Sequence, residues 1–188
     1  MKTGTIVLIV VVLALLLGGC EFVSTRNNLA REREAIAGQW SQVDADLQRR
    51  ADLIPNLVET VKGYAKEETT VVQEVANARA ALGGARTPQE KIDANTQLDG
   101  ALSRLLVVVE NYPNLKANEN FRQLQFELAG TENRILQSRR RYNEAVQRYN
   151  TDLSLFPANV VASMAGFQRE DAYFKTEPGA RTVPKVQF

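Results

Sequence analysis

The stretch from Asn118 to Leu153, NENFRQLQFELAGTENRILQSRRRYNEAVQRYNTDL, decides the fold class. Apolar side chains return along it at steps of three, four or seven residues: Phe121, Leu124, Leu128, Ile135, Tyr142, Val146, Tyr149 and Leu153. This spacing is typical of an amphipathic α-helix that buries one face. The sequence therefore predicts one long helix, which forms the backbone of the domain.

The residues before it predict further helices. A first amphipathic helix begins near Leu29, and we expect it to stop near Arg50, because Pro55 lacks a backbone N–H and would clash with Ala51 in a continuous helix. A second helix is expected from Asp52 to the Gly83-Gly84 pair.

A third helix is expected to start at Thr87-Pro88-Gln89-Glu90, where a threonine cap, a first-turn proline and a glutamate three residues after the cap agree. It should run to Tyr112, before Pro113. Residues 160–167 suggest one short further helix. The fold class is all-α: an elongated antiparallel bundle of about four long helices over residues 21–167, with a C-terminal tail at 168–188.

The N-terminus predicts a membrane anchor over residues 1–20. A positive start at Lys2 is followed by the apolar run Ile6–Leu17 and by Gly18-Gly19-Cys20, the pattern of a bacterial lipoprotein signal. Lipid attached to Cys20 is the favoured anchor. The alternative is an uncleaved transmembrane helix, since an 18-residue helix is nearly as long as a bilayer core is thick. We expect the bundle to face the periplasm or the extracellular side of the cell membrane.

Composition removes several classes of function. Lys and Arg (23) nearly cancel Asp and Glu (22), so the net charge of +1 disfavours nucleic acid as a partner. The chain has no histidine, which is the most frequent general base and metal ligand. The single cysteine permits no internal disulfide. No phosphate loop or metal-ligand spacing appears, and no cofactor is expected.

No catalytic apparatus can be identified. No serine lies in a G-x-S-x-G elbow, and the acidic residues Asp44, Asp46, Glu67 and Glu68 are interpreted as surface charge. We therefore expect a non-enzymatic scaffold or adaptor. Two alternatives stay open: an envelope hydrolase that uses carboxylates alone, and a small-molecule sensor with a pocket between helices near Tyr64 and Tyr142.

Several residues are candidates for either interaction or structure. Tyr142-Asn143 and Tyr149-Asn150 are two copies seven residues apart, so both tyrosines face one way. They form either a recognition strip for a partner or a packed core with asparagines that set the register. Trp40, Asn56 and Tyr64 complete the candidate set.

Longer motifs carry a resemblance to a known family. They are RRADLIPNLV at Arg49–Val58, VKGY at Val61–Tyr64, YPNLKANENF at Tyr112–Phe121, GTENRI at Gly130–Ile135, RYN at Arg141–Asn143, Tyr149-Asn150 and Phe156-Pro157. In their order and spacing these motifs resemble the LemA family over about residues 29–175.

The resemblance implies a membrane-anchored helical bundle outside the cytoplasm, in a family without an established enzyme activity or catalytic residues to carry over. Similar proteins often accompany TPM-domain membrane proteins and sometimes an HtpX-like membrane protease. The resemblance therefore implies an envelope protein as partner, with self-assembly as the other form of interaction. Many relatives keep an uncleaved N-terminal helix, so the family does not decide the anchor at Cys20.

Overall fold

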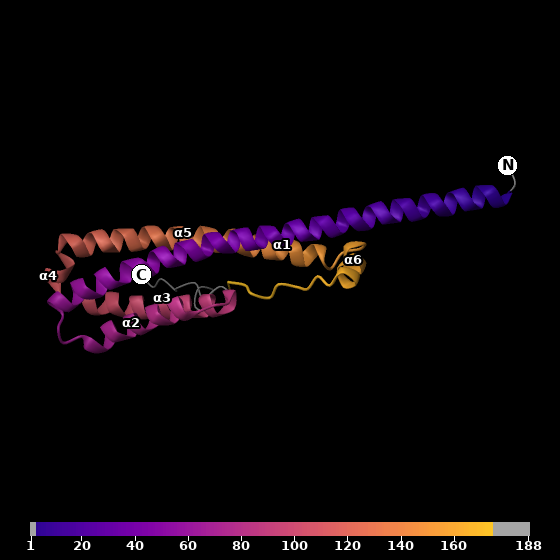
Figure 1. The fold of residues 1–188 in the computed structure, drawn as a ribbon. Helices are drawn as coiled ribbons and strands as arrows, with labels where there is room; N and C mark the ends of the chain where they lie inside the picture. The colour runs from indigo at the N-terminus through magenta and orange to yellow at the C-terminus, as the bar shows by residue number, and fades with distance from the viewer. Residues whose placement is uncertain (1–2, 175–188) are drawn as a thin grey trace, which may run out of the picture. The chain divides into compact units, whose positions relative to one another are not determined.

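The computed structural model describes residues 3–174 and is entirely helical within that range apart from its turns and connections (Figure 1). The helices are α1 Thr3–Tyr64, α2 Thr69–Gly84, α3 Pro88–Val109, α4 Pro113–Lys116, α5 Glu119–Asp152 and α6 Ala158–Ala165. The all-α prediction is confirmed. Most of the predicted tail at 168–188 lies outside the described residues.

The chain divides into two compact units, and both α1 and α5 contribute to each. The anchor unit contains the described residues up to Gln39 together with Arg141–Asp171. The bundle unit contains Trp40–Arg140 and, among the described residues, 172–174.

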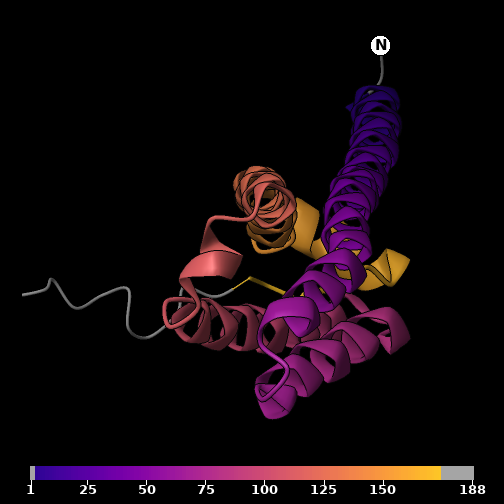
Figure 2. The same cartoon turned by 90° about the vertical axis from the view of Figure 1, so that its left-hand side faces the viewer.

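The bundle unit is an antiparallel arrangement of the last part of α1, α2, α3 and the first part of α5 (Figures 1 and 2). Its core is made by fully buried apolar side chains from these helices: Val43, Ile54, Val61, Val75, Leu98, Leu105, Phe121 and Ile135. The predicted start of α3 is confirmed, because the Thr87 hydroxyl accepts from the Glu90 N–H while the Glu90 carboxylate accepts from the Thr87 N–H.

The predicted helix end near Arg50 is wrong. Helix α1 continues through Pro55 to Tyr64, and the chain turns at residues 65–68 before α2. Pro55 leaves the Ala51 carbonyl without its helical donor, and Arg79 of α2 supplies one, with its Nε 3.0 Å from the Ala51 oxygen. A side chain from a neighbouring helix therefore compensates for the proline.

This compensation predicts an energetic coupling between Arg79 and Pro55. We expect Arg79→Met to lower the free energy of unfolding by about 1.5 kcal/mol, since it leaves a part-buried carbonyl unsatisfied. In a Pro55→Ala background the cost of Arg79→Met should nearly vanish, because alanine restores the backbone N–H that the Ala51 carbonyl lacks. Urea unfolding of the wild type, the two single mutants and the double mutant measures the coupling. If the effects of the two substitutions on the free energy of unfolding simply added, the coupling would be contradicted.

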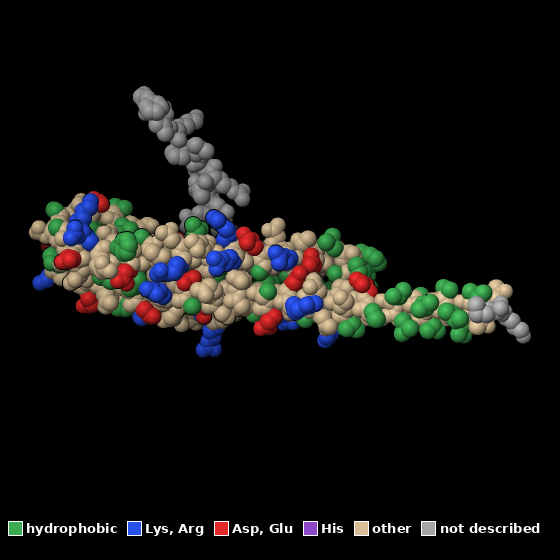
Figure 3. All heavy atoms as spheres, turned by 90° about the horizontal axis from the view of Figure 1, so that it is seen from above, with side chains coloured by type: hydrophobic (Ala, Val, Ile, Leu, Met, Phe, Trp, Pro, Cys, Tyr) green, Lys and Arg blue, Asp and Glu red, His purple; other side chains and the backbone are tan. Residues whose placement is uncertain are grey.

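The anchor unit begins with the exposed part of α1. Residues 3–21 are all exposed and mostly apolar, and Figure 3 shows hydrophobic side chains covering this stretch. It is long and apolar enough to cross a membrane. Further along α1, one stripe becomes covered at Phe22, Thr25, Leu29, Glu32 and Ile36.

Candidate functional site

A buried arginine lies at the centre of the bundle unit. Along α1 the buried positions Val43, Leu47, Ile54 and Val61 follow the spacing of one helix face, and Arg50 occupies the core position between Leu47 and Ile54. Arg50 is only 6% exposed. A charge at such a position is costly unless other groups compensate it.

Three residues surround the Arg50 guanidinium. Its Nη1 lies 2.5 Å from Oδ1 of Asp99 and 3.2 Å from Oδ1 of Asn95, both on α3, and 3.0 Å from Oε2 of Glu132 on α5. The Asn95 amide also donates to the second oxygen of Asp99 at 3.0 Å. The cluster therefore ties α1, α3 and α5 together through one cation and two carboxylates.

The hydrogen-bonding capacity of this cluster is not fully used. Nη1 carries two hydrogens but faces three oxygens, and the Arg50 Nε is buried without a hydrogen-bond partner. Such a group retains the capacity to bind a polar atom of a ligand or of water.

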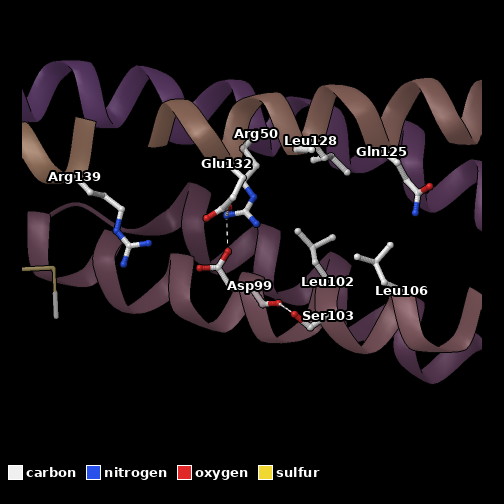
Figure 4. A pocket seen from close by; sticks show the side chains of 10 residues that line it. Arg50, Asp99, Leu102, Ser103, Leu106, Gln125, Leu128, Glu132 and Arg139 are labelled. Atoms are coloured by element: carbon white, nitrogen blue, oxygen red, sulfur yellow. Dashed lines mark hydrogen bonds and ion pairs between the residues drawn. The ribbon is translucent and has the colours of Figure 1, made fainter. Parts of the chain in front are cut away.

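Three members of the cluster, Arg50, Asp99 and Glu132, form the floor of a groove of about 650 Å³ between α3 and α5 (Figure 4). Apolar walls are provided by Leu102 and Leu106 of α3 and by Leu128 and Ala129 of α5. The remaining lining is polar and consists of Arg50, Asp99, Ser103, Gln125, Glu132 and Arg139. The groove is thus amphipathic, with both signs of charge present and an exposed leucine, Leu106, at its wall.

The predicted candidate Trp40 does not line this groove. It is half-buried and stacks on Phe174, with ring centroids 6.2 Å apart. The guanidinium of Arg139, which does line the groove, lies 4.5 Å from the centroid of the same Phe174 ring. Trp40, Phe174 and Arg139 therefore form one contact within the bundle unit.

Tyr142, Tyr149 and Asn150 are buried in the anchor unit, whereas Asn143 is half-buried. The Tyr149 hydroxyl donates to the Gln168 carbonyl at 2.9 Å. Asn150 makes two bonds to the backbone of Glu170, donating to its oxygen at 2.7 Å and accepting from its N–H at 3.0 Å. Tyr149 and Asn150 thus fasten the segment after α6 to the last turns of α5.

The other candidates lie at helix surfaces and ends. Asn56 is exposed on α1, and Cys20 is a free, exposed thiol. The Tyr64 hydroxyl, at the end of α1, accepts from the Asn118 amide at 2.9 Å, while Asn118 Oδ1 accepts from the Phe121 N–H at 3.0 Å. Asn118 therefore caps α5 and links it to α1.

The interpretation as surface charge is wrong for Asp46, whereas the side chain of Asp44 is 42% exposed. Asp46 is buried and accepts from the Ser138 hydroxyl of α5 at 2.7 Å, and half-buried Asp44 is paired with Lys91 of α3. Both carboxylates therefore contact residues of other helices, Asp46 on α5 and Asp44 on α3.

Comparison with known proteins assigns the chain to a family. The model of the LemA family matches residues 39–188, which include the whole buried cluster and its groove. The chain belongs to the LemA family. The sequence resemblance to that family is thereby confirmed.

Individual relatives of this LemA-family chain are distant in sequence. Magnetosome protein MamQ 2 of Paramagnetospirillum magneticum is 25% identical over 182 residues, covering 83% of this chain and 66% of the relative. Protein LemA of Metamycoplasma hominis is 25% identical over 142 residues, covering 75% and 65% respectively. Magnetosome protein MamQ of Magnetospirillum gryphiswaldense is 23% identical over 168 residues, covering 76% and 61%. The chain spans just under two thirds of the length of these relatives.

A second ionisable cluster lies in the anchor unit. Glu32 of α1 is half-buried, with Asn28 Nδ2 at 3.4 Å from its Oε1 and the carboxyl of Asp152 beside it. Burial, followed by this neighbouring carboxyl, raises the pKa of Glu32 to about 7, although Arg148 and Asn28 act in the opposite direction. With its pKa raised to about 7, Glu32 holds its proton in mildly acidic solution.

The raised pKa predicts that acid stabilises the anchor unit. Between the ordinary pKa of 4.5 and about 7, the folded chain holds a proton at Glu32 that the unfolded chain has lost, so stability decreases as pH rises through this window. Because the site is partly exposed, we expect a change of about 1 kcal/mol. Urea unfolding at pH 5 and pH 8 measures this change in the free energy of unfolding, and Glu32→Gln should abolish it. An equal change in the wild-type and Glu32→Gln chains would contradict the assignment of the pH dependence to Glu32.

The sequence contained a signal for the polar residues in the core of the bundle unit, around Arg50 and Asp46, that the prediction missed. On α3, Asn95 lies in the same stripe as the buried Ile92, Leu98 and Leu102, and on α5 the buried Thr131 and Ser138 lie in the stripe of Phe121, Ile135 and Tyr142. Polar residues at such apolar positions mark a polar core. The expected helix end near Arg50 concealed the corresponding position on α1.

Proposed function

We propose that this LemA-family chain is a membrane-anchored, non-enzymatic adaptor of the cell envelope that binds another protein in the groove between α3 and α5. The observation that supports this proposal most strongly is the lining of the groove, which has apolar walls at Leu106 and Leu128 and a charged floor at Arg50 and Glu132. Such a site suits an amphipathic segment of a partner, which would bury apolar side chains and present polar groups to the floor.

The anchor is the second part of the proposal. The length and hydropathy of the exposed apolar stretch of α1 support its role as a membrane segment. A lipid on Cys20 or an intact span would each hold the protein on the membrane, with the bundle on the extracytoplasmic side. Among partners, the family resemblance favours a TPM-domain membrane protein or a membrane protease, and a second copy of the chain is the alternative.

The position of Arg50 opposes the alternative of a carboxylate hydrolase. Asp99 and Glu132 do face one groove, but the Arg50 guanidinium lies between them and contacts both. A general acid and base acting on a bond would each need a free side towards the substrate.

Photocrosslinking in native membranes tests the adaptor function. A photoreactive phenylalanine replaces Leu106, which lines the groove, or Leu136, which is similarly exposed on α5 but does not line it. We expect a discrete adduct with one envelope protein from position 106 and none from position 136.

The adduct mass separates the outcomes of this experiment. An adduct with twice the mass of the chain would identify self-assembly as the form of interaction. No adduct from position 106, or the same adducts from both positions, would contradict binding in the groove.

A small-molecule sensor is the second candidate, at the groove between α3 and α5 and not near Tyr64 and Tyr142, which do not line this groove. The groove has a volume typical of ligand pockets and contains the unpartnered Arg50 Nε. A ligand retained by the purified wild-type chain and lost from Leu106→Asp, detected by mass spectrometry of the denatured sample, would favour this function over the adaptor.

A further inference from the structure

The segment between α5 and the end of α6 has an unusual surface. Residues 153–167, LSLFPANVVASMAGF, contain no charged side chain. Four large apolar side chains of this segment are nevertheless exposed: Leu155 by 55%, Phe156 by 82%, Val160 by 49% and Met164 by 73%. Its buried side chains are Val161 and Ala162, so α6 holds the segment in place by one face and presents the other outwards. Apolar surface of this kind marks an interaction site.

The covered stripe of α1 locates this segment within the anchor unit. Asp152, the last residue of α5, lies beside Glu32, and α5 runs antiparallel to α1 (Figure 1). Yet Leu29 is buried and Thr25 and Phe22 are half-buried, all nearer the N-terminus than Glu32.

Residues 153–167 are the part of the anchor unit that directly follows Asp152 along the chain. The part of the chain after them is bonded back to Tyr149 and Asn150 on α5. Residues 153–167 continue from the end of α5 towards this part of α1, whose half-buried Phe22 lies two residues, about 3 Å along the helix axis, from Cys20. Figure 3 shows hydrophobic side chains gathered where the apolar stretch of α1 joins the rest of this unit.

We propose that residues 153–167 form a second membrane contact, in which Leu155, Phe156, Val160 and Met164 insert into the interface of the bilayer that holds α1. This inference rests on the proposed membrane anchor and adds a lipid-binding surface to it. The exposed apolar residues and the apolar stretch of α1 belong to one compact unit. An uncharged apolar patch inserts by burying area and not by attraction to charged headgroups, so the contact should not require anionic lipid.

The test uses the full chain in phosphatidylcholine vesicles. The single tryptophan, Trp40, is first replaced by phenylalanine, and Phe156→Trp then places a fluorophore on the proposed contact. Phe126→Trp is the matched control, because Phe126 is 75% exposed on α5 in the bundle unit. Met164→Trp provides a second probe of the contact, and circular dichroism checks that each variant keeps its helix content.

We expect lipids brominated near the top of the acyl chains to remove about half of the emission from Phe156→Trp and Met164→Trp, with little effect on Phe126→Trp. Added salt and anionic lipid should leave this quenching unchanged. Equal, weak quenching of all three variants in vesicles that carry the floated protein would overturn the lipid contact and leave the anchor intact.

Two further outcomes would also overturn the inference. Failure of the wild-type chain to float with the vesicles would remove the anchor of the proposed function, and the lipid contact with it. A blue shift of the Phe156→Trp emission that grows with protein density, without quenching by brominated lipid, would instead assign the surface to a second copy of the chain.

Discussion

Replacing Arg50 by methionine is expected to lower the free energy of unfolding by about 3 kcal/mol, which corresponds to a fall of roughly 6–12 °C in Tm. The reason is that methionine would leave the Asp99 carboxylate, whose side chain is 21% exposed, and the more exposed Glu132 without a cation, and the Asn95 Oδ1 without this donor. Thermal and urea unfolding of the full chain in mild detergent measure the change.

The controls for Arg50→Met separate lost charge pairing from lost packing. Arg122→Met removes an exposed arginine of α5 and should change the stability by less than about 0.5 kcal/mol. Adding Asp99→Asn and Glu132→Gln to Arg50→Met should recover much of the loss, because the remaining groups are then neutral. If Arg50→Met proved as stable as Arg122→Met, the cluster would not tie the helices together.

Ser138→Ala is expected to lower the free energy of unfolding by about 2 kcal/mol, because it removes the hydroxyl that donates to the buried carboxylate of Asp46. Asp46→Ala should cost less, since the Ser138 hydroxyl then has the Arg134 carbonyl, at 2.8 Å, as its acceptor. Urea unfolding of both variants measures these two losses in the free energy of unfolding, and we expect the larger loss for Ser138→Ala.

Ser103→Ala is the matched control for Ser138→Ala. Ser103 is exposed on α3, and its hydroxyl donates to the carbonyl of Asp99 in its own helix, so its loss should have almost no effect. A cost for Ser138→Ala no larger than that for Ser103→Ala would mean that the Asp46 carboxylate is solvated and needs no donor.

Much of the fold could be predicted from local sequence. The apolar periodicity of α5 and the Thr87-Pro88-Gln89-Glu90 start of α3 are short-range signals, and the structure confirms both. The continuation of α1 through Pro55 could not be predicted in this way, because it depends on Arg79, a residue of another helix that supplies a donor to the Ala51 carbonyl. A tertiary contact here outweighs a local rule.

The groove was missed for a related reason. Arg50, Asp99 and Glu132 are separated by long stretches of sequence and become neighbours only when α1, α3 and α5 are packed in register. Because the first helix was expected to end near Arg50, the sequence did not predict that Arg50 lies on the buried face of a continuous helix. The aromatic pair Tyr142 and Tyr149 could be placed on one face from its spacing, but spacing alone could not distinguish a buried face from an exposed one.

Native mass spectrometry of the full chain, released from its own membranes in mild detergent, tests the adaptor function most directly. We expect a complex that contains this chain and a second envelope protein or a second copy. The complex should dissociate when Leu106 in the groove is changed to Asp but not when Leu136 is changed to Asp. A single chain in every charge state, or a complex that Leu106→Asp leaves intact, would contradict the adaptor function.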